Sequence, residues 1–119
     1  MKPFARQLGS ALLLMGQASA WAHATLQEAI PARDAELATP PKEIILRFNE
    51  KLEPAFSQAR LLAAGGMPVG AGRAAIDAGD PALMKLPLPT LKPGRYRVEY
   101  IVVGRDGHRR KGDYSFTLK

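Results

Sequence analysis

One segment constrains the fold of this chain more than any other: Arg95–Val103, which reads RYRVEYIVV. Side chains of a β-strand point alternately to its two faces, so a half-buried strand alternates between apolar and polar residues. The segment follows this rule: Tyr96, Val98, Tyr100 and Val102 lie on one face, and Arg95, Arg97 and Glu99 on the other. We therefore expect a long strand with one face in a core.

Further strands are expected between turns rich in Gly and Pro, because β-branched and aromatic residues cluster there. They are residues 24–30, 42–49, 56–64, 83–88 and 114–118. Periodicity leaves 56–64 open between strand and helix, but the Gly65-Gly66 pair that ends it favours a strand. No segment has a sustained helical stripe, so the fold class is all-β, a sandwich or barrel. The turn LKPGRY, which ends at Tyr96, is similar to the tyrosine corner of immunoglobulin-like sandwiches.

Composition limits what can hold such a fold together. The chain has 119 residues and no cysteine, which predicts one domain without disulfides and excludes thiolate metal sites. The formal net charge is +6 at pH 7, but the charges are spread along the chain, and no nucleic-acid binding is expected. One basic run is dense and is interpreted as a solvated strand end, with a docking patch as the alternative: Arg105, Arg109, Arg110 and Lys111.

The first 22 residues have the order of a secretory signal peptide. Lys2 and Arg6 supply basic charge, the run LGSALLLMG is apolar, and small residues precede Ala22. This run is shorter than the roughly 20 residues that span a bilayer. We therefore expect removal of residues 1–22 on export and a mature domain of residues 23–119 with no membrane span. Cuts before Trp21 or Thr25 remain open, since small residues precede these positions too.

The two histidines, His23 and His108, are the residues best suited to chemistry. If His23 is the N-terminus, its α-amine and its imidazole Nδ1 close a six-membered chelate ring on one metal ion. Asp106 and His108 are two apart and face the same side of an extended chain. Gly107 between them tolerates the backbone angles of a turn or bulge, which lets the pair converge. The predicted site has three nitrogens and one carboxylate oxygen.

Tetragonal coordination by nitrogen and oxygen is typical of Cu(II) or Ni(II), and copper ranks highest in the Irving–Williams order. We therefore predict one Cu(II) per chain, while a tetrahedral arrangement of the same ligands leaves zinc open. The α-amine, with a reference pKa of about 7.7–8.0, must lose its proton to bind, so affinity is expected to rise with pH. The alternative for each histidine, taken alone, is an ordinary surface residue.

Three stretches of the chain, taken in their order, resemble the sequences of the CopC family of periplasmic copper-binding proteins. They are His23-Ala24, then LRFNEKLEPAFS, then LKPGRYRVEYIVVGRDGHRRKGDYSF. The resemblance implies an immunoglobulin-like Greek-key β-sandwich or barrel of about seven strands in the periplasm. It implies a Cu(II) site made of His23, Asp106 and His108, with Glu50 as a carboxylate that supports a ligand by hydrogen bonding.

Some members of this family also hold Cu(I) with a methionine-rich loop, because soft thioethers suit that ion. The mature chain has only Met67 and Met84, in separate segments, so no Cu(I) site is expected. The family also usually has Ser two residues before the Asp, where this chain has Gly104.

The expected function is that of a periplasmic Cu(II) carrier or sequestering protein in copper resistance or homeostasis, and not of an enzyme. The family implies an inner-membrane copper transporter of the CopD type as a partner. One alternative is a copper-dependent polysaccharide monooxygenase. Two features argue against it: Asp106 would fill the open copper position that oxygen needs, and Tyr96 and Tyr100 face inward, where their rings cannot bind a polysaccharide. The other alternative is a metal-free immunoglobulin-like interaction module.

Overall fold

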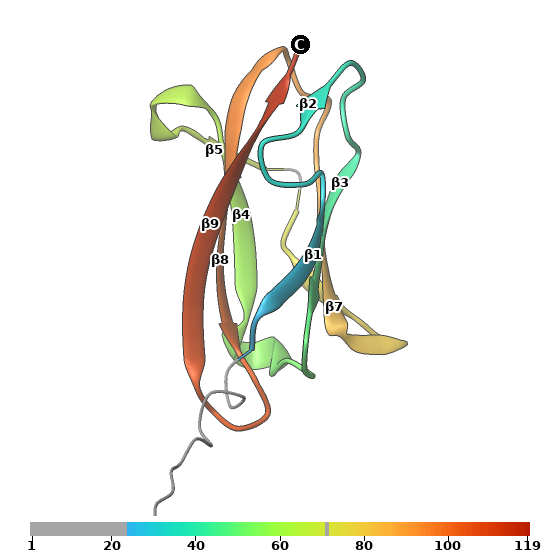
Figure 1. The fold of residues 1–119 in the computed structure, drawn as a ribbon, viewed down its shortest axis with the longest axis vertical. Coiled ribbons are helices and arrows are strands. Elements are labelled where there is room, and N and C mark those ends of the chain that lie inside the picture. Colours follow the sequence, from blue (N-terminus) through green and yellow to red (C-terminus); the bar gives the residue numbers. More distant parts are fainter. Residues whose placement is uncertain (1–23, 71) are drawn as a thin grey trace, which may run out of the picture.

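The computed structural model describes residues 24–70 and 72–119, which form two β-sheets packed face to face (Figure 1). One sheet has the strand order β1-β3-β7-β6 and the other β2-β9-β8-β4-β5. The strands are β1 (Leu26–Ile30), β2 (Glu36–Leu37), β3 (Glu43–Phe48), β4 (Gln58–Leu62), β5 (Pro68–Val69), β6 (Ala75–Asp77), β7 (Asp80–Pro87), β8 (Gly94–Val103) and β9 (Arg109–Leu118). Two single turns of 3-10 helix, η2 (Pro54–Phe56) and η3 (Ala64–Gly66), flank β4.

This architecture confirms the prediction of an all-β, immunoglobulin-like sandwich. The described residues contain nine strands where about seven were expected, and the two-residue strands β2 and β5 account for the difference. β2 pairs in parallel with the end of β9. β5 follows the turn at η3 and pairs in the antiparallel direction with the end of β4. Such short edge strands carry too few residues to show an alternating pattern in the sequence.

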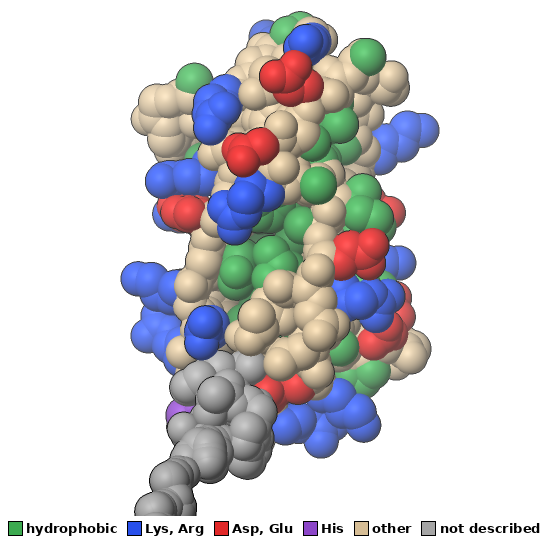
Figure 2. Space-filling view, in the orientation of Figure 1, with side chains coloured by type: hydrophobic (Ala, Val, Ile, Leu, Met, Phe, Trp, Pro, Cys, Tyr) green, Lys and Arg blue, Asp and Glu red, His purple; other side chains and the backbone are tan. Residues whose placement is uncertain are grey.

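The core lies between the sheets and follows the alternation of the long strands. Tyr96, Val98 and Val102 of β8 are buried, and Tyr100 is half-buried near the edge, as the pattern predicts. On the facing sheet, Leu46 and Phe48 of β3 are buried. Figure 2 shows apolar side chains in the opening between the two sheets, on the side where β9 faces β1.

The turn before β8 is a tyrosine corner, as its sequence predicts. The hydroxyl of Tyr96 donates a hydrogen bond to the carbonyl of Lys92 at 2.5 Å. The ring of Tyr96 stacks on Phe116 of β9, with centroids 5.6 Å apart. The corner therefore ties the entry of β8 to the neighbouring strand.

Several strand boundaries differ from the predicted ones, and three of them have a clear structural reason or a shift of several residues. β9 begins at Arg109 and not at Tyr114, because residues 109–113 pair with β8 along a hairpin although they are mostly polar. The segment predicted as a strand from residue 56 begins with η2, and pairing starts only at Gln58. β7 begins at Asp80, three residues before the predicted start. None of the helical segments in residues 24–70 and 72–119 has the length and apolar character needed to cross a membrane.

Candidate metal centre

The β8–β9 hairpin ends in a tight turn, Gly104–His108, which carries two of the predicted ligands. The amide of Gly107 donates to the carbonyl of Gly104 at 2.9 Å, and the amide of Gly104 donates to the carbonyl of His108 at 3.3 Å. Gly107 has a φ of +86°, a conformation that glycine adopts without the penalty other residues incur. Gly107 thus closes the turn between Asp106 and His108, as expected from the sequence.

The structure brings the side chains of Asp106 and His108 together. Oδ2 of Asp106 lies 3.0 Å from Nδ1 of His108, and Oδ1 accepts a hydrogen bond from the backbone amide of His108, also at 3.0 Å. The carboxylate is 30% exposed and the imidazole 56% exposed, so both groups are reachable from solvent. The turn therefore presents one carboxylate and one imidazole at its tip.

The separation of these two atoms is compatible with a shared metal ion. Imidazole nitrogen and carboxylate oxygen bind a divalent ion such as zinc at about 2.0–2.2 Å. Two such ligands at right angles lie about 3 Å apart, and at a tetrahedral angle about 3.4 Å apart. The observed 3.0 Å is close to the right-angled arrangement. Binding of a metal ion between them would replace this hydrogen bond and would require Nδ1 of His108 without a proton.

The predicted ligand His23 lies outside the described residues. The residues that follow it are held firmly at this end of the sandwich. Ala24 is fully buried, and Thr25 and Asn49 form a reciprocal pair: Thr25 N donates to Asn49 Oδ1 at 2.7 Å, and Asn49 N donates to Thr25 O at 3.0 Å. The start of β1 and the β8–β9 turn lie at the same end of the molecule in Figure 1.

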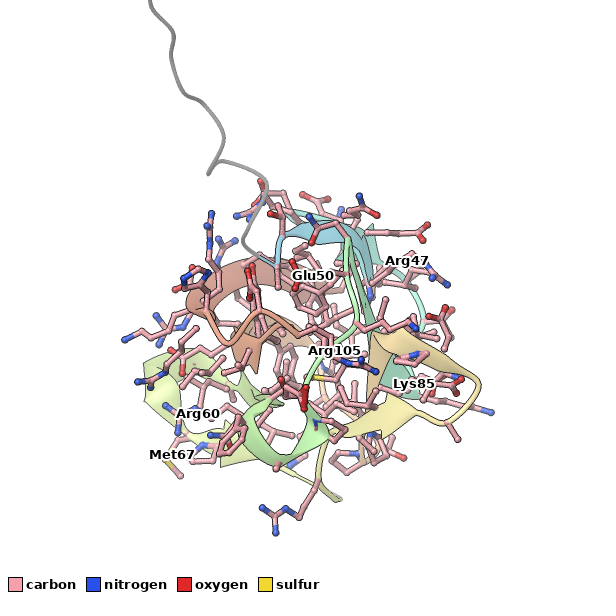
Figure 3. All side chains as sticks on the ribbon, turned by 90° about the horizontal axis from the view of Figure 1, so that it is seen from below. Arg47, Glu50, Arg60, Met67, Lys85 and Arg105 are labelled. Carbon is pink, nitrogen blue, oxygen red and sulfur yellow. The ribbon has the colours of Figure 1, made fainter. Side chains whose placement is uncertain are left out.

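Glu50, predicted to support a ligand, lies directly beneath the turn. Its carboxyl group packs over the Cα of Gly104, at a position that a side chain on residue 104 would occupy. The adjoining backbone holds the same register, since Leu52 forms a β-bridge with Gly104 and the amide of Arg105 donates to the carbonyl of Lys51 at 3.1 Å. Figure 3 looks onto this end of the sandwich and labels Glu50 and Arg105. The placement explains why glycine stands at position 104.

Two contacts at this end were missed from the sequence. Asn49, the residue before Glu50, forms hydrogen bonds with Thr25. Gly104 leaves room for the Glu50 carboxylate. The only local signal for Asn49 is a polar residue at the end of an apolar strand. Its partner is 24 residues away, and such a distance has no periodic signature.

Within residues 24–70 and 72–119, no three His, Cys, Asp or Glu side chains converge into a metal-binding group. Of the predicted ligand set, the described residues thus contain the pair Asp106 and His108 alone. The methionines of the domain lie in unlike surroundings: Met84 is buried in the core, whereas Met67 is 66% exposed after η3.

Comparisons with known proteins show which family this chain is similar to. A family model described as the CopC domain matches residues 26–119. Protein YobA of Escherichia coli strain K12 is 36% identical over 124 residues, which cover 100% of both chains. Copper resistance protein C of Escherichia coli is 38% identical over 116 residues, 90% of each chain.

Two solved structures share the fold. CopC from Methylosinus trichosporium OB3b superposes with a TM-score of 0.77 at 35% identity, over 82% of this chain and 94% of that one. PcoC, a methionine-rich copper resistance protein from Escherichia coli, superposes with a TM-score of 0.73 at 37% identity, over 82% of this chain and 99% of that one. On the family match, the sequence identities and the shared fold, the chain belongs to the CopC family.

Proposed function

We propose that this protein binds one Cu(II) ion in the periplasm and carries or sequesters it in copper resistance or homeostasis. The observation that carries the proposal is the 3.0 Å separation of Asp106 Oδ2 and His108 Nδ1 on an exposed turn. The relatives support copper as the cargo, because three of them are named copper resistance protein C. In this proposal copper is the cargo of the protein and not a catalytic cofactor.

The ligand set that we propose consists of His23, Asp106 and His108. His23 would contribute its α-amine and Nδ1 after removal of residues 1–22 as a signal peptide. The position of Ala24, buried at the end of the sandwich that carries the turn, supports a ligand immediately before it. Glu50 would orient the turn from below through its carboxylate, which packs over Gly104.

Cu(II) is favoured over zinc by the donor set and by its higher place in the Irving–Williams order. Mixed nitrogen and oxygen ligands at right angles suit Cu(II), whereas zinc prefers tetrahedral sites. The different surroundings of Met67 and Met84 support the proposal that the domain has no Cu(I) site of the methionine-rich kind.

A carrier function is proposed in preference to an enzyme. In a copper monooxygenase, oxygen needs an open position on the metal, and Asp106 would occupy one in the proposed site. Polysaccharide docking relies on several exposed aromatic rings, whereas among the described residues only Phe56 is a strongly exposed aromatic, Tyr96 is buried and Tyr100 packs edge-on against Phe48 at 5.4 Å. Transfer to an inner-membrane transporter of the CopD type is proposed as the route of the ion.

The proposal is tested by native mass spectrometry of the protein exported through its own N-terminal segment, with one equivalent of Cu(II) and competing zinc. The expected species begins at His23 and retains one copper. A matched variant with one extra Ala between Ala22 and His23 removes the α-amine from the chelate ring and should lose copper to a competing chelator first. A mature species that begins at Trp21 or Thr25, or equal retention by the extended variant, would refute the terminal chelate.

A further inference from the structure

A groove of about 1220 Å³ lies beside the β8–β9 turn, on the outer face of the five-stranded sheet. Ile101 and Val103 of β8 form its floor, and they alternate with buried Val102, which places them on the face away from the core. η2 and residues 72–74 form its walls. Gly107 and Arg105 of the turn also line it, so the groove opens next to Asp106 and His108.

The groove exposes apolar surface that the fold itself does not use. Phe56 of η2 is 68% exposed, the largest exposed fraction among the big apolar side chains of the described residues. Ile101 and Val103 are half-buried on the same surface. An aromatic side chain held at the rim of a hollow is typical of a recognition site, because it offers contact area at a small entropic cost.

The charge of the groove is positive on balance. Arg73, Arg105 and Arg109 line it, against a single acidic residue, Glu53, which lies 3.7 Å from Arg105. In the part of the chain that the structure describes, Arg73 and Arg109 take part in no ion pair. Lys111 follows on the same outer face of β9, and Figure 2 shows Lys and Arg side chains in blue along the edge where β9 begins.

The remainder of this sheet face is different. Further along β4 and β8, Arg60 and Arg97 both bind the carboxylate of Glu99, at 2.8 and 2.9 Å. There each arginine has a carboxylate partner within the protein. Arg109 and Lys111, by contrast, lie on β9 at the end that carries the turn and take part in no ion pair among the described residues. Both belong to the basic run for which the sequence left a solvated strand end and a docking patch as alternatives.

We propose that this groove docks an acidic segment of a partner protein, with carboxylates facing the arginines and an apolar side chain against Phe56 and Ile101. Charge complementarity favours an acidic partner and speeds its association. The concave shape favours a polypeptide segment over a planar membrane surface. Docking itself is independent of the metal, and only its use in copper transfer rests on the proposed function.

The test uses the metal-free protein and a synthetic fluorescein-labelled peptide of about twelve residues in which Glu alternates with Leu and Phe. Amide chemical shifts in NMR report where it binds, and fluorescence polarisation reports how tightly. Arg109→Glu and Phe56→Ala should each weaken binding about three- to tenfold, since one removes a charge pair and the other an apolar contact. The matched control is Arg95→Glu, with the same charge change on an exposed residue at the far end of β8.

The expected result is a set of shifts confined to the groove, with binding that weakens as salt rises and that Arg95→Glu leaves unchanged. If Arg95→Glu weakens peptide binding as much as Arg109→Glu, the effect depends on net charge alone, and the proposal is overturned. Absence of binding would do the same, as would a preference for vesicles containing phosphatidylglycerol. Copper titration of Phe56→Ala separates the two proposals: retained copper affinity with weakened peptide binding supports a distinct docking groove, and loss of both contradicts it.

Discussion

The carboxyl group of Glu50 lies over the Cα of Gly104, so that the two residues fill one space under the β8–β9 turn. A Cβ at position 104 would collide with the end of the Glu50 side chain, to which the three nearest heavy atoms all belong. Glu50 is flexible at that end, whereas the backbone of Gly104 is fixed by its bridge to Leu52. A side chain added at position 104 would therefore displace the Glu50 carboxylate and leave the backbone in place.

The first prediction follows from this contact. Gly104→Ala should displace the Glu50 carboxylate and lower the free energy of unfolding by about 1 kcal/mol, the lower end of the usual effect of overpacking. In a Glu50→Ala background the same substitution should have little effect, because the colliding atoms are gone. Urea unfolding of the four proteins measures this coupling. Gly70→Ala is the control, since a side chain there meets open space. Additive effects of the two substitutions would contradict the shared space.

The second prediction concerns the proposed ligands on the turn. Asp106→Ala and His108→Ala should each weaken Cu(II) binding by at least about tenfold, the low end of what loss of a ligand or its supporting contact does. Competition titration with a chromophoric chelator measures the affinity. Asp113→Ala serves as the control, because this exposed carboxylate lies on β9, outside the turn, and its only ion pair among the described residues is a loose one with Arg97, at 3.9 Å. If all three variants bind copper equally well, the turn is not the metal site.

The third prediction concerns a second close approach, between Tyr100 and Gly112, which face each other across the β8–β9 ladder. The ring and hydroxyl of Tyr100 lie over Gly112, and the ring also packs on Phe48. Gly112→Ala should lower the free energy of unfolding by about 1–3 kcal/mol, because a ring held on both sides cannot move away. Denaturant unfolding, again beside Gly70→Ala, measures the loss. An effect no larger than that of the control would show that Tyr100 is free to rotate.

The fourth prediction is a loss of stability in alkali. Burial raises the pKa of Tyr114, whose hydroxyl donates to the carbonyl of Pro31 at 2.8 Å. A pKa that is higher in the folded state means that stability is intact below the ordinary value of 10.0 and falls as the pH rises above it. Unfolding free energies measured from pH 8 to pH 11 should fall more steeply for the wild type than for Tyr114→Phe.

Tyr114→Phe should also lose about 1 kcal/mol at neutral pH, since it leaves the Pro31 carbonyl without its donor. Tyr100 contributes to the alkaline limb as well, because burial raises its pKa in the same direction. The difference between the two proteins, and not the whole limb, is therefore assigned to Tyr114. Parallel curves would place the titrating group elsewhere.

Sequence patterns predicted the parts of the fold that depend on a regular spacing of residues along the chain. The alternation in β8 identified its buried face, and the spacing of Asp106, Gly107 and His108 predicted two side chains that converge on a turn. The first half of β9 was missed because Arg109–Asp113 has little apolar content, and it is a strand only because β8 pairs with it. Cross-strand pairing of that kind leaves no local signature.

Local patterns also could not predict the contacts that hold the end of the sandwich together, because these contacts join residues far apart in the chain. Asn49 pairs with Thr25, and Glu50 fits against Gly104, through contacts between residues far apart in the chain. Glu50 was singled out only through the family resemblance, which implied a role but not a neighbour. The structure adds the neighbour and thereby gives a physical reason for the glycine.

The two ends of the proposed ligand set belong to different sheets. Ala24 leads into β1 of the four-stranded sheet, whereas Asp106 and His108 sit on the hairpin of the five-stranded sheet. An ion bound by residue 23 and by the turn would close a loop of nearly the whole domain and fasten one sheet to the other. In a chain without cysteine, the cargo would then act as a removable cross-link, and release of the ion would loosen the open end of the sandwich.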